Sequence, residues 1–105
     1  LPFLFVQLPE FERTAGWWWL RDSQRRVALH VDRAAMFVAI GNGELDDIHP
    51  PHKEPVGRGL ADMALRMVYD RPGPVMGPLA AGMIVSGDTA TVRFVHADGG
   101  LVCRG

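Results

Sequence analysis

Residues 34–49 read AAMFVAIGNGELDDIH, an uninterrupted apolar run followed by a short stretch rich in glycine and acidic residues. The apolar part, residues 34–40, has the composition of a strand covered on both faces, as in a parallel sheet. The polar part brings Asp46, Asp47 and His49 close together in the sequence. Ligands of open α/β sheets bind beyond the carboxyl ends of the strands. This stretch therefore predicts both a fold class and the place of a site.

Upstream of this stretch lies a second apolar run, LPFLFVQL at residues 1–8, which is closed by Pro9. We predict that residues 3–8 and 36–40 form adjacent parallel strands joined by a right-handed crossover. The crossover contains a predicted helix near residues 17–29. Its core-facing positions are predicted to be Trp17, Leu20, Gln24 and Val27 or Ala28. Its solvated face is predicted to hold Arg21, Asp22, Arg25 and Arg26.

Downstream of the polar stretch, a second helix is predicted near residues 54–69. Apolar residues step by three and four along it, at Val56, Leu60, Met63 or Ala64, and Met67. Residues 70–78, DRPGPVMGP, have the composition of a linker. Short β-type runs follow at residues 83–85, 89–95 and 101–103. We therefore predict an α/β part over residues 1–70 and a linker with an accessory β segment over residues 71–105.

The bulk composition limits the classes of function. The chain has 105 residues, a formal net charge of −1 and a sequence pI near 6.4, so nothing favours binding to nucleic acid or to an anionic membrane. No apolar run approaches the roughly 20 residues that span a bilayer. The single Cys103 excludes an internal disulfide and a cysteine-based zinc site. The chain opens directly in a buried-strand composition, so we expect a piece of a longer polypeptide.

The acidic stretch has the chemistry of half a catalytic triad. A carboxylate two or three residues before a histidine can accept the Nδ1 hydrogen of the imidazole, which leaves Nε2 free to act as a base. A solvated acidic turn before a helix has the same composition, so both interpretations stand. A metal site formed by Asp46, His49 and His52 is disfavoured, because Pro50 and Pro51 oppose the helical turn that would bring the two histidines together.

A nucleophile is not apparent in the sequence. Ser23 lies among charges in the first predicted helix and Ser86 precedes a β turn, and neither has a neighbour that would activate it. The run of three tryptophans at residues 17–19 cannot face one way. Either one or two of these rings join the core, or the run forms a platform on which sugars stack.

Several segments together resemble a known family. These are LPFLFVQLPEF at residues 1–11, Trp17 with Leu20, Arg21 and Gln24, and the DIHP block at residues 47–50 followed by Lys53 and by VGR at residues 56–58. In this order they resemble the C-terminal part of sialate O-acetylesterases, a branch of the SGNH (GDSL-like) hydrolases. The chain departs from that pattern at Gly41, where some relatives carry Asp, and at His52, where Asn is common.

The resemblance implies part of a three-layer, flavodoxin-like α/β fold and a serine esterase that removes O-acetyl groups from sialic acid or related sugars. It implies that His49 is the general base. The spacing of SGNH hydrolases assigns the orienting carboxylate to Asp46, whereas the DIHP block assigns it to Asp47, and we favour Asp46. The nucleophilic serine and the oxyanion donors are expected upstream, in a missing N-terminal part of the same protein.

The resemblance also suggests an extracytoplasmic location and an acetylated sugar as the substrate, and it calls for no cofactor. Because the nucleophile is missing, we expect residues 1–105 alone to be inactive. The alternative interpretation is a non-catalytic carbohydrate-binding or scaffold fragment, with the tryptophan run at residues 17–19 as its binding surface.

Overall fold

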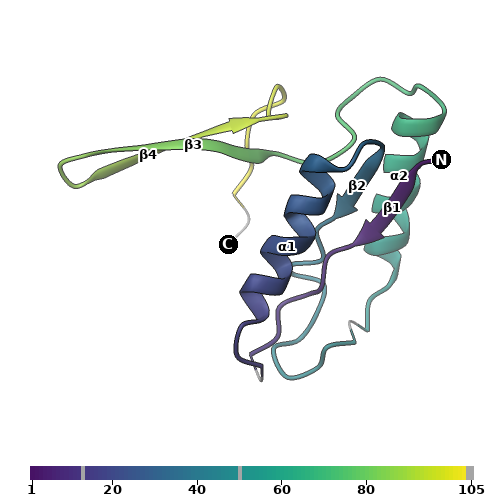
Figure 1. Ribbon diagram of the computed structural model, residues 1–105, viewed down its shortest axis with the longest axis horizontal. Helices are drawn as coiled ribbons and strands as arrows, with labels where there is room; N and C mark the ends of the chain where they lie inside the picture. The colour runs from purple at the N-terminus through teal and green to yellow at the C-terminus, as the bar shows by residue number, and fades with distance from the viewer. Residues whose placement is uncertain (13, 50, 104–105) are drawn as a thin grey trace. The chain divides into compact units, whose positions relative to one another are not determined.

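The computed structural model describes residues 1–12, 14–49 and 51–103, which form a mixed α/β chain (Figure 1). The elements in order are β1 (Phe3–Val6), α1 (Trp17–His30), β2 (Ala34–Phe37), α2 (Glu54–Val68), β3 (Leu79–Ser86) and β4 (Thr89–Val95). The chain divides into two compact units, Leu1–Val75 and Met76–Gly105. Each unit has its own sheet.

Strands β1 and β2 are parallel neighbours, which confirms the predicted pairing. Phe3 is paired with Ala34 and Val6 with Phe37. The ladder ends where the Gln7 amide donates to the Phe37 carbonyl, at 2.8 Å. The Leu8 amide instead donates to Oε1 of Gln24, at 3.0 Å, and Pro9 has no amide hydrogen to offer. Residues 38–40, which we predicted to be strand, therefore have no partner on β1 and leave the sheet.

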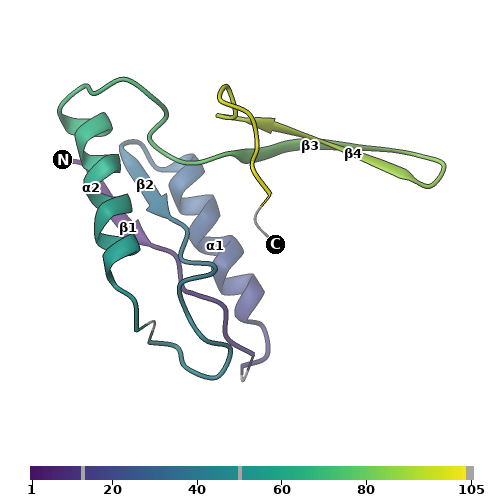
Figure 2. The same cartoon turned by 180° about the vertical axis from the view of Figure 1, so that it is seen from behind.

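Helix α1 lies on one face of this sheet and helix α2 on the other (Figures 1 and 2). The predicted apolar stripe of α2 is confirmed, because its members are buried or half-buried, with Met63 the most enclosed at 4% exposure. Gly59 brings the helix close to the sheet, and a Cβ at this position would overlap the ring of Phe37. The absence of a side chain at Gly59 thus sets the distance between helix and sheet.

The predicted inner face of α1 was wrong at two positions. Leu20, expected in the core, is 49% exposed, whereas Arg21, expected in solvent, is half-buried. The reason is polar: Gln7, the buried residue that follows β1, donates through Nε2 to the Arg21 carbonyl at 3.0 Å. Oε1 of Gln7 lies 3.4 Å from Nη2 of Arg21. Hydrogen bonds of Gln7 and Gln24 therefore join α1 to the end of β1. The helix is rotated about its axis relative to the predicted orientation, so that Arg21 is more buried than Leu20.

The core of the first unit is built from small side chains and two methionines. Its buried apolar residues are Ala28, Ala34, Ala35, Met36, Ala39 and Met63. Aromatic residues remain at its margin: Phe3 is 59% exposed and stacks on Phe5 with the ring centroids 5.5 Å apart. Exposed aromatic side chains beside a two-stranded sheet are a surface that another part of a protein could cover.

The second unit is an antiparallel hairpin. Ser86 pairs with Thr89 across a tight turn in which Gly87 adopts a left-handed φ of 57°, a conformation that glycine supplies in two-residue hairpin loops. A bulge interrupts the ladder between Ala80 and Gly82. All of β4 and all of β3 except Leu79 are exposed. Residues 101–103 form no strand, contrary to the prediction for that run.

Candidate active site

The loop that connects β2 to α2 is a succession of tight turns. In the first turn the Asn42 amide donates to the Ala39 carbonyl at 3.1 Å, with Gly41 in the third position at a φ of 80°. This is the position at which a type II turn requires glycine. In the second turn the Asp47 amide donates to the Glu44 carbonyl at 3.2 Å. Backbone hydrogen bonds within the loop therefore form two turns before His49.

The side chain of Asp47 makes the next turn of the loop, at residues 47–49. Its Oδ1 accepts the backbone amide of His49 at 2.8 Å, which is the geometry of an Asx turn. The same oxygen lies 3.4 Å from Nδ1 of the His49 ring. The side chain of His49 is 86% exposed and that of Asp47 is 55% exposed, so the pair is open to a reactant from outside the loop.

Oδ1 of Asp47 therefore lies beside the imidazole, and Asp46 is exposed in the same turn. A histidine whose Nδ1 lies beside a carboxylate is suited to act as a general base once a nucleophile is supplied. His52 lies three residues beyond His49 and is exposed. Among the described residues no group of three His, Cys, Asp or Glu side chains could hold a metal ion.

A second loop, which connects β1 to α1, is bonded to the first. The Gly41 amide donates to both carboxylate oxygens of Glu10, at 2.9 and 3.1 Å. Four residues further on, the Leu45 carbonyl accepts the Glu12 amide at 3.0 Å. The connecting loop is in turn fixed to α1, because Nε1 of Trp17 donates to the Pro9 carbonyl at 2.8 Å. Sequence reasoning missed Glu10, whose partner lies 31 residues away.

A surface hollow of about 280 Å³ lies between these two loops and the start of α1. The described residues that line it are Glu10, Phe11, Glu12, Thr14, Trp17, Trp18, Arg21 and Leu45. Leu45 directly precedes Asp46, so the hollow borders the turn that carries the Asp47–His49 pair. Trp18 is 62% exposed and stacks on Trp19, with the ring centroids 4.1 Å apart. Trp17 is half-buried, whereas Trp18 and Trp19 are exposed.

The hydroxyls of the chain do not complete a catalytic set. Oγ of Ser23 donates to the Trp19 carbonyl at 2.9 Å within α1. Ser86 ends β3 in the second unit. Within residues 1–12, 14–49 and 51–103, neither hydroxyl is hydrogen-bonded to a histidine.

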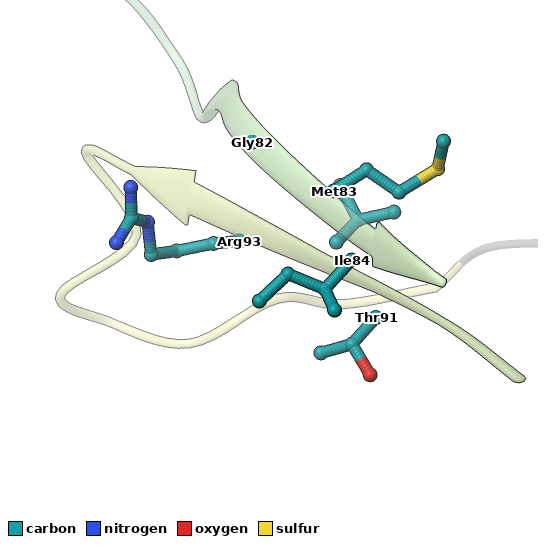
Figure 3. Close-up of a pocket in the computed structure, with 6 residues that line it drawn as sticks. Gly82, Met83, Ile84, Thr91 and Arg93 are labelled. Carbon is teal, nitrogen blue, oxygen red and sulfur yellow. The ribbon is translucent and has the colours of Figure 1, made fainter. Parts of the chain in front are cut away.

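The hairpin has a larger hollow, of about 490 Å³, which borders residues on both strands (Figure 3). Met83 and Ile84 are consecutive in β3 and point to opposite faces, as strand alternation requires. The volume therefore extends around the ribbon and is not enclosed by it. Arg93 is the one charged side chain among the described residues that line it.

Neither α1 nor α2 has the length and apolar content of a bilayer-spanning helix, and the described part of the chain holds no other candidate.

The chain matches no protein-family model and no curated protein sequence. Among solved structures it is similar to a carbohydrate acetylesterase from Xanthomonas citri, with 32% sequence identity over 90% of the chain and a TM-score of 0.79. The chain spans 23% of the length of that protein. The match supports a relationship to carbohydrate acetylesterases, which are carboxylic ester hydrolases, and is consistent with a fragment of an esterase fold.

Proposed function

We propose that the chain is the part of a serine-type carbohydrate esterase that supplies the general base and its orienting carboxylate. The observation that carries the proposal is the position of Nδ1 of His49, 3.4 Å from Oδ1 of Asp47 in the loop that follows a parallel strand. The similarity to a carbohydrate acetylesterase supports the class of reaction. The resemblance to sialate O-acetylesterases of the SGNH type supplies the substrate class, O-acetylated sialic acid or a related acetylated sugar.

The proposed reaction proceeds in two acyl-transfer steps. A serine from outside residues 1–105 attacks the acetyl carbonyl while Nε2 of His49 takes the serine proton. The resulting imidazolium returns the proton to the sugar oxygen as the ester bond breaks. Water then attacks the acetyl-serine, again with its proton passing to His49, and acetate leaves as the serine is reprotonated. Asp47 or Asp46 would hold the ring and stabilise the imidazolium.

The partner of this chain in the reaction is therefore the remainder of the same polypeptide, which would carry the serine and the oxyanion donors. The exposed aromatic margin at Phe3 and the high exposure of His49 support such a complement. An extracytoplasmic location is part of the proposal and rests on the family resemblance alone.

The proposal is tested by measuring acetate release from acetylated sugars and hydrolysis of a chromogenic acetate. The complete polypeptide should be active and the chain of residues 1–105 inactive, since the latter lacks a nucleophile. Turnover by residues 1–105 that is lost in His49→Ala would show that a nucleophile lies within them, with Ser86 and then Ser23 to be reconsidered. Inactivity of the complete polypeptide on every acetate ester would overturn the proposal.

The orienting carboxylate is identified by separate Asp46→Asn and Asp47→Asn substitutions in the complete polypeptide. Asparagine keeps the size of the side chain but cannot stabilise the imidazolium, so the orienter should show much the larger loss of kcat. The short distance from Oδ1 of Asp47 to Nδ1 of His49 favours Asp47, and the family spacing favours Asp46.

A second candidate function, a non-catalytic carbohydrate-binding fragment, is favoured by one observation. The stacked rings of Trp18 and Trp19 are 62% and 61% exposed. A fragment of this kind would bind sugars, and the complete polypeptide would have no esterase activity.

A further inference from the structure

We propose that the hollow beside the His49 loop is a sugar-binding subsite, which takes the pyranose ring of a neutral acetylated sugar. This inference rests on the proposed function and specifies its substrate. The hollow consists of the described residues around Trp18, Arg21, Glu10 and Glu12, with Leu45 as its border toward the catalytic loop.

The aromatic wall supplies the surface on which a sugar ring can stack. Trp18 lines the hollow and presents an indole that is 62% exposed. Trp19 stacks on Trp18 with the ring centroids 4.1 Å apart and the ring planes 24° apart, but of these two rings only that of Trp18 is among the described residues that border the hollow. An exposed indole offers a large apolar contact area with only two side-chain torsions to fix.

Arg21 supplies hydrogen-bond donors that the protein leaves largely unused. Among the described residues, the one hydrogen bond that its guanidinium makes is to Oε1 of Gln7, at 3.4 Å. A guanidinium carries five N–H donors in a planar fork. Oxygen acceptors on a sugar, such as hydroxyls and acetyl carbonyls, match these donors.

The charge of the described lining indicates which sugars fit. Glu10 and Glu12 contribute two carboxylates, against the single guanidinium of Arg21. Carboxylates accept hydrogen bonds from sugar hydroxyls but repel the carboxylate of an acidic sugar. The Glu10 carboxylate is also fixed by the Gly41 amide, so it cannot turn away. The hollow should therefore discriminate against sialic acid in favour of a neutral pyranose.

The test separates binding from catalysis. The chain of residues 1–105 is titrated with a mono-O-acetylated methyl glucopyranoside and with O-acetylated N-acetylneuraminic acid, while the indole Nε1–H signals of the three tryptophans are followed by NMR. The neutral sugar should shift the Trp18 signal at lower concentration than the acidic sugar does. Trp18→Ala and Arg21→Met should each weaken binding of the neutral sugar by roughly tenfold.

Two matched variants serve as controls. Trp19 is as exposed as Trp18 but does not line the hollow, and Arg25 lies on the same helix as Arg21 but pairs with Asp22. Trp19→Ala and Arg25→Met should leave binding of the neutral sugar within about twofold.

Three outcomes would overturn the subsite. They are an equal effect of Trp18→Ala and Trp19→Ala, tighter binding of the acidic sugar, and sugar-induced shifts away from Trp18. If any of them is seen while the complete polypeptide still hydrolyses acetylated sugars, the subsite is wrong and the proposed function stands. If acetylated sugars are neither bound nor hydrolysed, both are wrong.

Discussion

The two units of the chain differ in what holds them together. In the first unit a short parallel sheet of four paired positions is enclosed by a helix on each face, and it buries Ala35, Met36 and Met63 almost completely. In the second unit a longer antiparallel ladder buries almost nothing, with Ile84 as much as 73% exposed. Burial of apolar surface is the main source of stability, whereas a lone hairpin is marginal in water. The first unit should therefore carry both the stability and the chemistry.

The largest expected effect concerns activity. In the complete polypeptide, His49→Ala should lower kcat/KM for acetate esters by roughly 10⁴–10⁶-fold, because it removes the proposed general base. His96→Ala is the matched control, since His96 is exposed just beyond β4 in the second unit. It should retain near-normal activity. A comparable loss in both variants, with folding intact, would place part of the chemistry in the hairpin.

The next effect concerns burial and uses two methionines. Met63 is 4% exposed and Met83 is 65% exposed. Met63→Ala should lower the free energy of unfolding by about 2–5 kcal/mol, and Met83→Ala should change it by less than about 0.5 kcal/mol. Denaturant unfolding of the chain followed by tryptophan fluorescence measures both, because all three tryptophans belong to the first unit. Equal losses of unfolding free energy in the two variants would mean that Met83 is buried in solution.

A smaller effect on stability is expected at the contact between α2 and the sheet. Gly59→Ala should destabilise the chain by roughly 1–3 kcal/mol, because the new methyl group would meet the Phe37 ring. Gly57 lies on the same helix with nothing within 4 Å of an added Cβ. Gly57→Ala should stabilise by up to about 1 kcal/mol through helix propensity. The same denaturant series applies, and a stabilising Gly59→Ala would contradict the close approach described above.

The smallest effect is electrostatic. Hydrogen bonds from Arg26 and then from Arg25 hold the pKa of Asp22 below its ordinary value of 3.8. A carboxyl whose pKa is lower in the folded state stabilises the fold above its unfolded pKa, and that contribution is lost as the pH falls through the folded value. Asp22→Asn should therefore reduce the unfolding midpoint slightly at pH 6, and the difference from wild type should vanish below the lowered pKa.

An Arg26→Gln variant provides the control for this ion pair. It should show a similar small loss at pH 6, and the double variant should show less than the sum of the two losses. The ion pair is exposed to solvent, so salt should diminish each difference. A midpoint difference that persists unchanged at low pH would contradict an electrostatic origin.

Much of the first unit could be predicted because its signals are local. Apolar spacing alone predicts both helices, the parallel pairing of β1 with β2, and the apolar face of α2. The errors arose where a long-range polar contact decided the structure. The rotation of α1 depends on Gln7, which reads as part of an apolar run but bonds to Arg21. The early end of β2 depends on the amide of Leu8, which bonds to Gln24 instead of continuing the ladder.

The candidate site could be predicted only in part for the same reason. The loop of Asp46, Asp47 and His49 follows from the change of pattern at the end of an apolar run. The role of Asp47 in an Asx turn agrees with its place two residues before His49. Nothing local shows that Glu10 accepts the Gly41 amide, or that Leu45 closes a hollow against Trp18. Such contacts depend on how two loops meet at one edge of a sheet.

The stacked indoles of Trp18 and Trp19 have an optical consequence. Two aromatic chromophores held 4.1 Å apart with their planes 24° from parallel couple their electronic transitions, and such coupling gives circular dichroism that isolated indoles lack. Because one of the two rings lines the hollow and the other does not, a molecule that enters the hollow and moves the Trp18 ring must change that signal. The protein therefore carries a spectroscopic probe of its own surface, which needs no label.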